Sequence, residues 1–326
     1  MIDVPPSPDH SEVDLGAAAG VSDRGLRHLR NEDAMALALQ QTPDGLVVVA
    51  VVCDGVSSSP RPDEAAQLAA EAALPVLLAA VRDGGDPAEA SQAAVQAGRE
   101  SVAGMGEPAN ERSATTFISA VAEPGDVTLC WLGDSRAYWL AQPASESVPL
   151  TRDDSVAGGM VEAGLASEEA AMASPHAHVL TRWLGAEAAD LGGDPARAPH
   201  VERYSPPGTG VLLVCSDGLW NYLPDAADLA GLALPGALND PLGAAADMVQ
   251  FAVDAGGADN ITVVLIPYPR RRAPDPLSTW VRRTHPAAPP LRGGPRRWRS
   301  AWKTARPLRA DPESRRTAGV CPATRW

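Results

Sequence analysis

The sequence predicts an α+β fold, in which antiparallel β-sheets carry helices on their outer faces. Strand-like segments come in adjacent runs, helix-like segments come in pairs, and the two do not alternate strictly along the chain. Strict alternation is typical of parallel sheets, whereas grouped strands and grouped helices favour antiparallel sheets with helices packed outside them. The 326 residues are 45% hydrophobic, which is enough for a substantial core.

The strands are predicted from short apolar or alternating runs that end at turn residues. They cover residues 15–22, 34–40, 46–53, 114–122, 126–132, 136–141, 201–205, 210–216 and 260–266. Four helices are predicted over residues 62–82, 87–104, 160–172 and 241–255. The second helix begins at Asp86-Pro87, with Glu89 in the position of a capping box, and the last begins in the same way at Asp240-Pro241.

The composition divides the chain into three parts. We expect a disordered N-terminus over residues 1–13, a folded domain over residues 14–269 and a disordered tail rich in proline and arginine over residues 270–326. The tail holds 15 of the 27 basic residues and 3 of the 41 acidic ones, so the remainder of the chain is strongly acidic. Arginine clusters of this kind can bind nucleic acid or an anionic surface. A solvated tail is the favoured interpretation.

The sequence indicates a cytoplasmic protein without a membrane span. Its apolar runs are shorter than the ~18 residues that a spanning helix requires, and the chain does not open with a signal peptide. Cys53, Cys130 and Cys215 lie in apolar runs, so we expect buried thiols in a reducing compartment. The spacing of cysteines and histidines does not suggest zinc.

Two predicted core strands end in Asp-Gly. VVVAVVCDG places Asp54 and Gly55 at the end of one, and VLLVCSDG places Asp217 at the end of the other. The sheet holds such a carboxylate in place, and the glycine lets the backbone turn and approach a ligand closely. Three further acidic turns, RNED, GDSR and GADN, lie beside predicted strands. Each alone is explained by the preference of Asp and Gly for turns, but five acids converging at one sheet edge require a cation. Oxygen ligands favour magnesium or manganese.

Six stretches carry a resemblance to a known family. They are SDRGLRHLRNEDA, VVCDG, SATTFISAV, LCWLGDSRAYWL, LLVCSDGLWNYL and GGADNITVVLI, and they spread over residues 15–267. In this order they resemble the bacterial metal-dependent serine/threonine protein phosphatases of type 2C, the PPM family. The resemblance implies a phosphatase catalytic domain with two central antiparallel sheets flanked by helices, an α-β-β-α sandwich.

The resemblance also implies a site for two Mn²⁺ or Mg²⁺ ions. Asp54 would bridge both ions, and Gly55 would contribute its carbonyl oxygen. Asp217 and Asp259 would complete one ion's ligands, and Glu32 would bind the other, partly through water. Asp54, Asp217 and Asp259 are the expected catalytic residues.

Two further acids belong to the same pattern. Asp33 is expected behind the metal ligands rather than among them. Asp134, together with Asp217, matches acids that are linked to a third, weaker metal in bacterial members of the family.

This site would hydrolyse phosphoserine and phosphothreonine on proteins. Two cations ~3.5–4 Å apart can share a water and lower its pKa, and they neutralise charge on the phosphoryl oxygens. The expected partners are therefore the phosphorylated substrates of a serine/threonine kinase.

The chain departs from the family pattern near the substrate. DGVSSS places Val56, Ser57 and Ser58 where the family has a glycine-rich turn, which removes one general acid. Ala177 and His178 stand where an Arg-Asn pair is common, in a segment that resembles the mobile flap beside the active site. These departures concern the predicted substrate side of the site and not the predicted metal ligands.

The position of the phosphate-binding arginine is occupied by a histidine. In the family this arginine lies four residues before the metal-linked glutamate, which corresponds to His28, with Arg27 and Arg30 nearby. His28 would bind phosphate as a cation, or act as a general acid, or be structural while Arg27 or Arg30 binds the phosphate. In a strand, Arg27 would face away from His28.

Two other functions remain open. The acid cluster could stabilise a catalytically weak module that binds phosphoproteins. Cys130 to Arg136 also fits the C-x-x-G-x-x-R loop of cysteine-dependent phosphatases. That loop normally leads into a helix, whereas here we expect the return strand of a hairpin, with Cys130 buried. Substitution of Cys130, compared with chelation of the metal, separates the two mechanisms.

Overall fold

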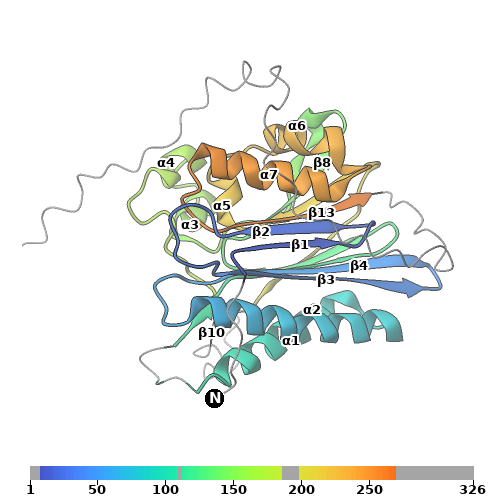
Figure 1. Cartoon of the computed structure of the whole chain (residues 1–326), viewed down its shortest axis with the longest axis horizontal. Coiled ribbons are helices and arrows are strands. Elements are labelled where there is room, and N and C mark those ends of the chain that lie inside the picture. Colours follow the sequence, from blue (N-terminus) through green and yellow to red (C-terminus); the bar gives the residue numbers. More distant parts are fainter. Residues whose placement is uncertain (1–7, 107, 109–111, 186–197, 269–326) are drawn as a thin grey trace, which may run out of the picture. The chain divides into compact units, whose positions relative to one another are not determined.

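The computed structural model describes residues 8–106, 108, 112–185 and 198–268. Within these residues two antiparallel sheets form the centre of a four-layered sandwich (Figure 1). Helices α1 (Pro62–Asp83) and α2 (Pro87–Ala103) form one outer layer. Helices α6 (Ala226–Ala237) and α7 (Pro241–Ala255) form the other. The predicted α+β fold with two central antiparallel sheets is confirmed.

The six-stranded sheet has the order β1-β2-β13-β12-β8-β9. These strands are His10–Asp14, Ala19–Asp23, Ile261–Tyr268, Gly210–Cys215, Arg136–Ala141 and Val148–Pro149. The five-stranded sheet has the order β11-β7-β6-β4-β3. Its strands are His200–Tyr204, Val127–Leu132, Phe117–Ala122, Gly45–Asp54 and Asp33–Thr42. A short pair, β5 (Ala114–Thr115) and β10 (Leu184–Gly185), lies beside them.

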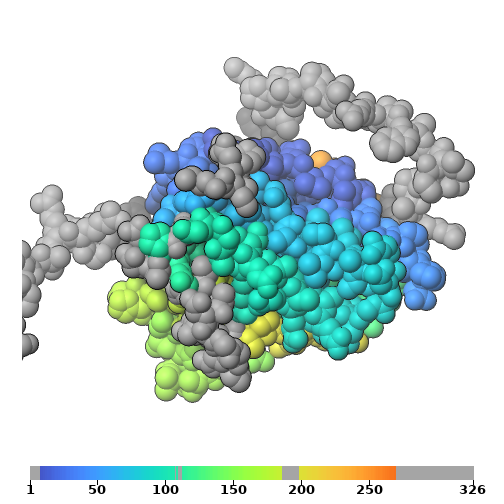
Figure 2. All heavy atoms as spheres, turned by 90° about the horizontal axis from the view of Figure 1, so that it is seen from below, coloured from blue at the N-terminus to red at the C-terminus, as the bar shows by residue number. Residues whose placement is uncertain are grey.

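Two apolar cores hold the layers together. Between the sheets, alternate residues of β4, β6 and β7 pack against β8, β12 and β13. On the outer side of the five-stranded sheet, Val49 and Val51 pack under the alanines of α1 and α2. Figure 2 shows this outer face, where α1 and α2 cover the sheet. Strands buried on both faces carry continuous apolar runs, which explains VVVAVVC in β4.

Helix α1 would be long and apolar enough to cross a membrane by length and composition alone. In the structure Ala65, Ala66, Ala69, Ala73 and Leu77 are fully buried in the core under the sheet. Small side chains let the helix approach the sheet closely, so the apolar composition of α1 is explained by packing.

Several element predictions differ from the structure at their ends. The N-terminal segment predicted to be disordered through residue 13 contains β1, which pairs with β2 from His10 to Asp14. The strand predicted over 15–22 begins only at Ala19, because residues 15–18 turn between β1 and β2. The tail predicted over residues 270–326 lies outside the described residues, so the domain boundary at 269 stays a prediction.

The helix predicted over 160–172 is two short helices, α3 (Val156–Glu162) and α4 (Glu168–Met172). Gly164, at a φ of 67°, lies in the turn between them. Helix α6 was not predicted, because Gly231, Pro235 and Gly236 interrupt its pattern. Asp225 caps its N-terminus, and buried leucines and alanines hold it against the sheet.

Candidate active site

The two Asp-Gly turns lie at the same end of the two sheets. Asp54 is the last residue of β4, and Asp217 follows β12 and begins the short helix α5 (Asp217–Trp220). A Cβ atom on Gly55 would lie 2.5 Å from the carbonyl oxygen of Pro62, and one on Gly218 would lie 1.9 Å from that of Asn260. Both glycines are therefore needed because another stretch of this chain's backbone packs against them. The close approach that we predicted toward a ligand is, in this structure, an approach to the protein's own backbone.

The backbone of Asp54 is fixed by two threonines of the neighbouring segment. The Thr115 hydroxyl donates to the Asp54 carbonyl oxygen at 2.9 Å, and the Asp54 amide donates to Thr116 Oγ1 at 2.9 Å. These bonds hold the end of β4, so the Asp54 carboxylate projects from a rigid position.

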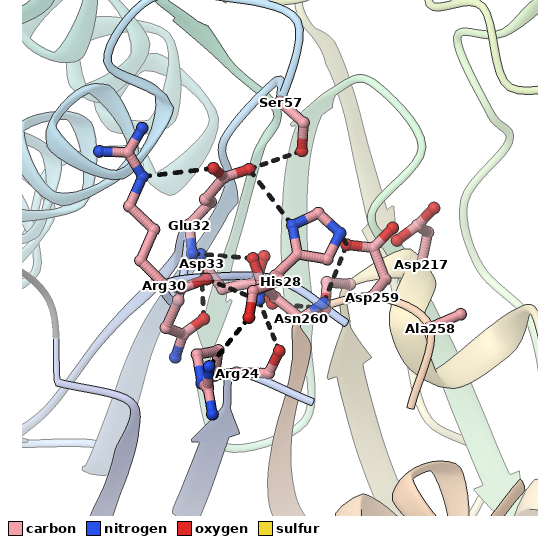
Figure 3. Close-up of polar contacts among 12 residues, drawn as sticks. Arg24, His28, Arg30, Glu32, Asp33, Ser57, Asp217, Ala258, Asp259 and Asn260 are labelled. Atoms are coloured by element: carbon pink, nitrogen blue, oxygen red, sulfur yellow. Dashed lines mark hydrogen bonds and ion pairs between the residues drawn. The ribbon is translucent and has the colours of Figure 1, made fainter. Parts of the chain in front are cut away.

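Asn260 joins the GADN turn to the loop that carries Glu32. Its side-chain amide donates to the carbonyl oxygens of Arg24 and Arg30 at 2.8 and 3.1 Å. Its Oδ1 accepts a hydrogen bond from the Glu32 amide at 2.8 Å. Figure 3 shows Asn260 among these residues, with Asp259 beside it. This one buried side chain therefore positions two of the predicted metal ligands relative to each other.

Asp33 lies behind the cluster, as a buried hydrogen-bond acceptor. Its Oδ2 accepts hydrogen bonds from the hydroxyls of Ser216 and Thr262, both at 2.7 Å. Its Oδ1 is buried without a partner among the described residues. Burial, with a smaller contribution from the carboxylates of Asp259 and Glu32, raises the pKa of Asp33 to about 7, although the two hydroxyl bonds act to lower it.

The carboxylates at this end of the sheets repel one another. Burial, and then the charges of Asp33, Asp217 and Asp259, raise the pKa of Asp54 well above its usual value. Burial also raises the pKa of Asp217 strongly, with Asp259 and Asp134 as the largest neighbouring charges. The pKa of Asp134 rises to about 7, mainly through burial. Acids that are costly to ionise together are stabilised by a bound cation.

The donor set fits a hard divalent cation. The side chains that converge here offer carboxylate oxygens, and Asp217 Oδ1 is buried without a hydrogen-bond partner among the described residues. Oxygen ligands of this kind suit Mg²⁺ and Mn²⁺. Ligand atoms of Asp134, Asp217 and His178 lie within 4.8 Å of one another.

A cleft of about 670 Å³ opens over the acids. One wall comes from the turn after β4, and the opposite wall comes from the segment before β10. Its lining residues are Asp54, Gly55, Val56, Ser57, Ser58, Ser59, Pro60, Arg112, Ala114, Thr116, Asp134, His178, Val179, Leu180, Trp183, Asp217 and Asp259. The cleft therefore combines an acidic floor with mixed polar and apolar walls.

His28 lies among the predicted metal ligands. Its Nε2 is 3.1 Å from Asp259 Oδ1, and its Nδ1 is 3.7 Å from Glu32 Oε2 (Figure 3). Residues 24–32 form a turn rather than a strand, so alternation of faces does not apply to Arg27 and His28. Arg27 is exposed, and Arg30 pairs with Glu32 Oε1 at 3.4 Å. Of the three, His28 therefore has the most direct contact with the acids on both sides.

Sequence reasoning missed three features of this site. Ser57, which replaces a glycine of the family pattern, donates a hydrogen bond to Glu32 Oε2 at 2.5 Å. Asn260 was treated only as part of a motif, although it holds Glu32 in place. His178 was noted as a departure but not as a neighbour of Asp134, because the two are 44 residues apart and only the fold brings them together.

Cys130 does not have the environment of a nucleophile. It lies in the middle of β7, fully buried, and burial raises the pKa of its thiol to about 12. The predicted hairpin after it is wrong, because β8 belongs to the other sheet. Arg136 pairs with Asp153 at 2.8 Å and does not line a phosphate loop with Cys130.

Residues 24–236 match the family model of protein phosphatase 2C. This match covers more than half of the chain, so the chain belongs to that family, and the resemblance drawn from the motifs is confirmed. The serine/threonine protein phosphatase PstP of Mycobacterium tuberculosis is 29% identical over 252 residues, which cover 76% of this chain and 44% of PstP. The chain thus matches less than half of the length of that curated relative.

Two solved structures agree with this assignment. The PPM Ser-Thr phosphatase MsPP of Mycobacterium smegmatis, in complex with cacodylate, is 30% identical with a TM-score of 0.58. The match covers 76% of this chain and 97% of MsPP. The catalytic domain of PstP in complex with two manganese ions is 26% identical with a TM-score of 0.59, over 76% of this chain and 96% of that one.

Proposed function

We propose that this protein hydrolyses phosphoserine and phosphothreonine on proteins at a site that holds two divalent cations. The observation that carries the proposal is the convergence of carboxylates from separate turns on the floor of one cleft, where burial and mutual repulsion raise their pKa values. The two manganese ions of the PstP structure support the same number of cations here.

The predicted ligands keep their roles in this proposal. Asp54 would hold both cations, and Gly55 would offer its carbonyl oxygen. Asp217 and Asp259 would hold one cation, and Glu32 would hold the other. When bound, the cations lower the pKa of a water molecule and neutralise charge on the phosphoryl oxygens.

The remaining residues orient this set. Thr115 and Thr116 fix Asp54, Asn260 fixes the Glu32 loop, and Asp33 anchors the strand ends through Ser216 and Thr262. Hydrolysis exchanges the ester P–O bond for a bond to a water oxygen, and the leaving serine or threonine oxygen takes up a proton.

His28 is the described residue that we assign to the phosphate or to that proton. Its Nε2 lies 3.1 Å from Asp259 Oδ1, and its Nδ1 lies 3.7 Å from Glu32 Oε2. A protonated imidazole can contact a phosphoryl oxygen or donate to the leaving oxygen. The cleft walls carry the selectivity for protein substrates, which are the products of a serine/threonine kinase. Cytoplasmic localisation stays a prediction from the sequence.

An assay on a generic phosphate ester and on phosphothreonine peptides, with and without Mn²⁺, tests the proposal. We expect hydrolysis of both substrates that requires the metal and is lost in Asp54→Asn. A protein that binds phosphopeptides without hydrolysing them at saturating Mn²⁺ would support the phosphoprotein-binding alternative instead.

A further inference from the structure

A small subassembly borders the cleft on the side opposite β4. It runs from Ser155 to Leu180 and contains α3 and α4, and we call it the flap segment. It has its own small apolar core of Ala157, Ala171 and Ala177. Its two ends are joined by the bridge between Ser155 and Leu180 and by the Val156 amide, which donates to the Val179 carbonyl oxygen at 2.9 Å. Local contacts therefore hold the segment together and leave His178 exposed at the cleft.

His178 lies on a rigid aromatic support. Its ring stacks on Trp220, with ring centroids 6.2 Å apart and planes inclined by 27°. Trp220 is buried, its Nε1 donates to the Asp134 carbonyl oxygen at 2.9 Å, and the Arg136 guanidinium lies 3.7 Å from its ring centroid. Arg136 is held in turn by two 2.8 Å bonds to Asp153. The orientation of the imidazole toward the acids is thus supported from behind.

Two carboxylates that face His178 have unused ligand capacity. Asp134 is 6% exposed, and no side chain among the described residues forms a hydrogen bond with its carboxylate. The carboxylate of Asp217 makes one side-chain hydrogen bond, in which its Oδ2 accepts from Asn221 Nδ2 at 3.0 Å. Its Oδ1 is buried and has no hydrogen-bond partner in the described structure. Buried polar atoms without partners are costly unless an ion or water completes them.

We propose that His178 is a metal ligand of this protein, and that a cation bound by Asp134, Asp217 and His178 fastens the flap segment over the cleft. The inference rests on the proposed metal-dependent function and goes beyond it in one respect. The family resemblance links only the two acids to a third metal, whereas here the flap segment supplies a nitrogen ligand. The common asparagine at this position does not offer an imidazole.

The nitrogen ligand has a consequence for the choice of metal. Imidazole suits transition metals such as Zn²⁺, Fe²⁺ and Ni²⁺, whereas Mg²⁺ keeps oxygen ligands and water. We therefore expect this site to discriminate against Mg²⁺ more than the site built from Asp54 and Asp259. Binding also couples to the position of the flap segment, because one ligand belongs to it and two belong to the sheets.

Mn²⁺ binding to the full chain, followed by calorimetry and by the electron paramagnetic resonance of free Mn²⁺, tests the inference. We expect wild type to bind two Mn²⁺ ions tightly and a third more weakly. His178→Ala should weaken the third site on the order of 10-fold or more, since even loss of a group behind a ligand costs about that much, and should leave the other two unchanged. His176→Ala is the matched control, because His176 is exposed on the same segment and is not part of the cluster.

Limited proteolysis of the same proteins reports on the flap segment without depending on activity. Mn²⁺ at a concentration that fills the third site should slow cleavage within residues 156–178 in wild type and in His176→Ala. It should not slow this cleavage in His178→Ala. His178→Asp replaces the nitrogen ligand by an oxygen ligand. In this variant Mg²⁺ should compete with Mn²⁺ for the third site more effectively than in wild type. Superimposable Mn²⁺ isotherms for wild type and His178→Ala would overturn this inference and leave the two-cation proposal intact. Absence of the two tight sites from wild type would overturn both.

Discussion

Substitution of Gly218 by alanine tests the packing that brings the acids together. The added Cβ would lie 1.9 Å from the Asn260 carbonyl oxygen, whereas real Cβ contacts are essentially never under 3.0 Å. One of the two backbones must therefore move by about 1 Å. Asn260 makes three hydrogen bonds to the loop of Arg24, Arg30 and Glu32, and this movement would strain them.

The expected cost can be estimated from these contacts. Overpacking costs typically about 1–3 kcal/mol, and each buried polar group left without a partner costs about 1–3 kcal/mol more. We expect Gly218→Ala to lower the free energy of unfolding by about 2–4 kcal/mol. Gly231→Ala is the matched control, because Gly231 lies in α6 with nothing within 4 Å of an added Cβ. Alanine should stabilise that helix by about 0.5–1 kcal/mol.

Urea denaturation of both variants in the presence of a chelator measures the difference without a contribution from bound metal. The Gly218→Ala midpoint should fall clearly below wild type, and the Gly231→Ala midpoint should rise slightly. Mn²⁺ affinity of Gly218→Ala should also fall, because Asn260 positions Glu32. Equal midpoints for the two variants would refute the packing argument.

Three further predictions concern single groups. Burial raises the pKa of Asp33 from 3.8 to about 7, so the folded protein binds this proton more tightly than the unfolded chain does. The metal-free protein should therefore lose stability as the pH rises from about 4 to about 7. Asp33→Asn should flatten this pH dependence of the urea midpoint, and an unchanged slope would contradict the argument. Cys130→Ala should keep Mn²⁺-dependent hydrolysis, whereas a chelator should abolish it; the opposite pair of results would favour the cysteine mechanism. His28→Arg should lower KM at saturating Mn²⁺, since arginine stays charged and offers a planar fork to a phosphate; unchanged KM and kcat would exclude a functional role for His28.

The class of fold and the gathering of acids at one cleft could be predicted because local signals agree. Buried strands such as β4 carry an uninterrupted apolar run, and the Asp-Gly turns mark their ends in the sequence. Helix starts at Pro87 and Pro241 follow capping signals that act over a few residues, so both are placed correctly.

The features that could not be predicted depend on contacts between distant parts of the chain. Helix α6 forms against the sheet despite Gly231 and Pro235, so tertiary packing overrides its weak propensity. Strand β1 forms by pairing with β2, and its polar sequence carries no local signal for that pairing. The crossing from β7 to the other sheet, and the approach of His178 to Asp134, follow from the topology of the sandwich and have no local signature.

Calorimetric titration of Mn²⁺ into Asp54→Asn, with hydrolysis measured on the same samples, tests the central claim most directly. Asp54 is assigned to both tightly bound cations, so the account predicts that both tight sites weaken together, on the order of 10-fold or more, and that hydrolysis of phosphothreonine peptides is lost. Asp83→Asn is the control, because Asp83 is an exposed residue that pairs with Arg82 at the end of α1. Two tight sites with unchanged Kd in Asp54→Asn would contradict the account.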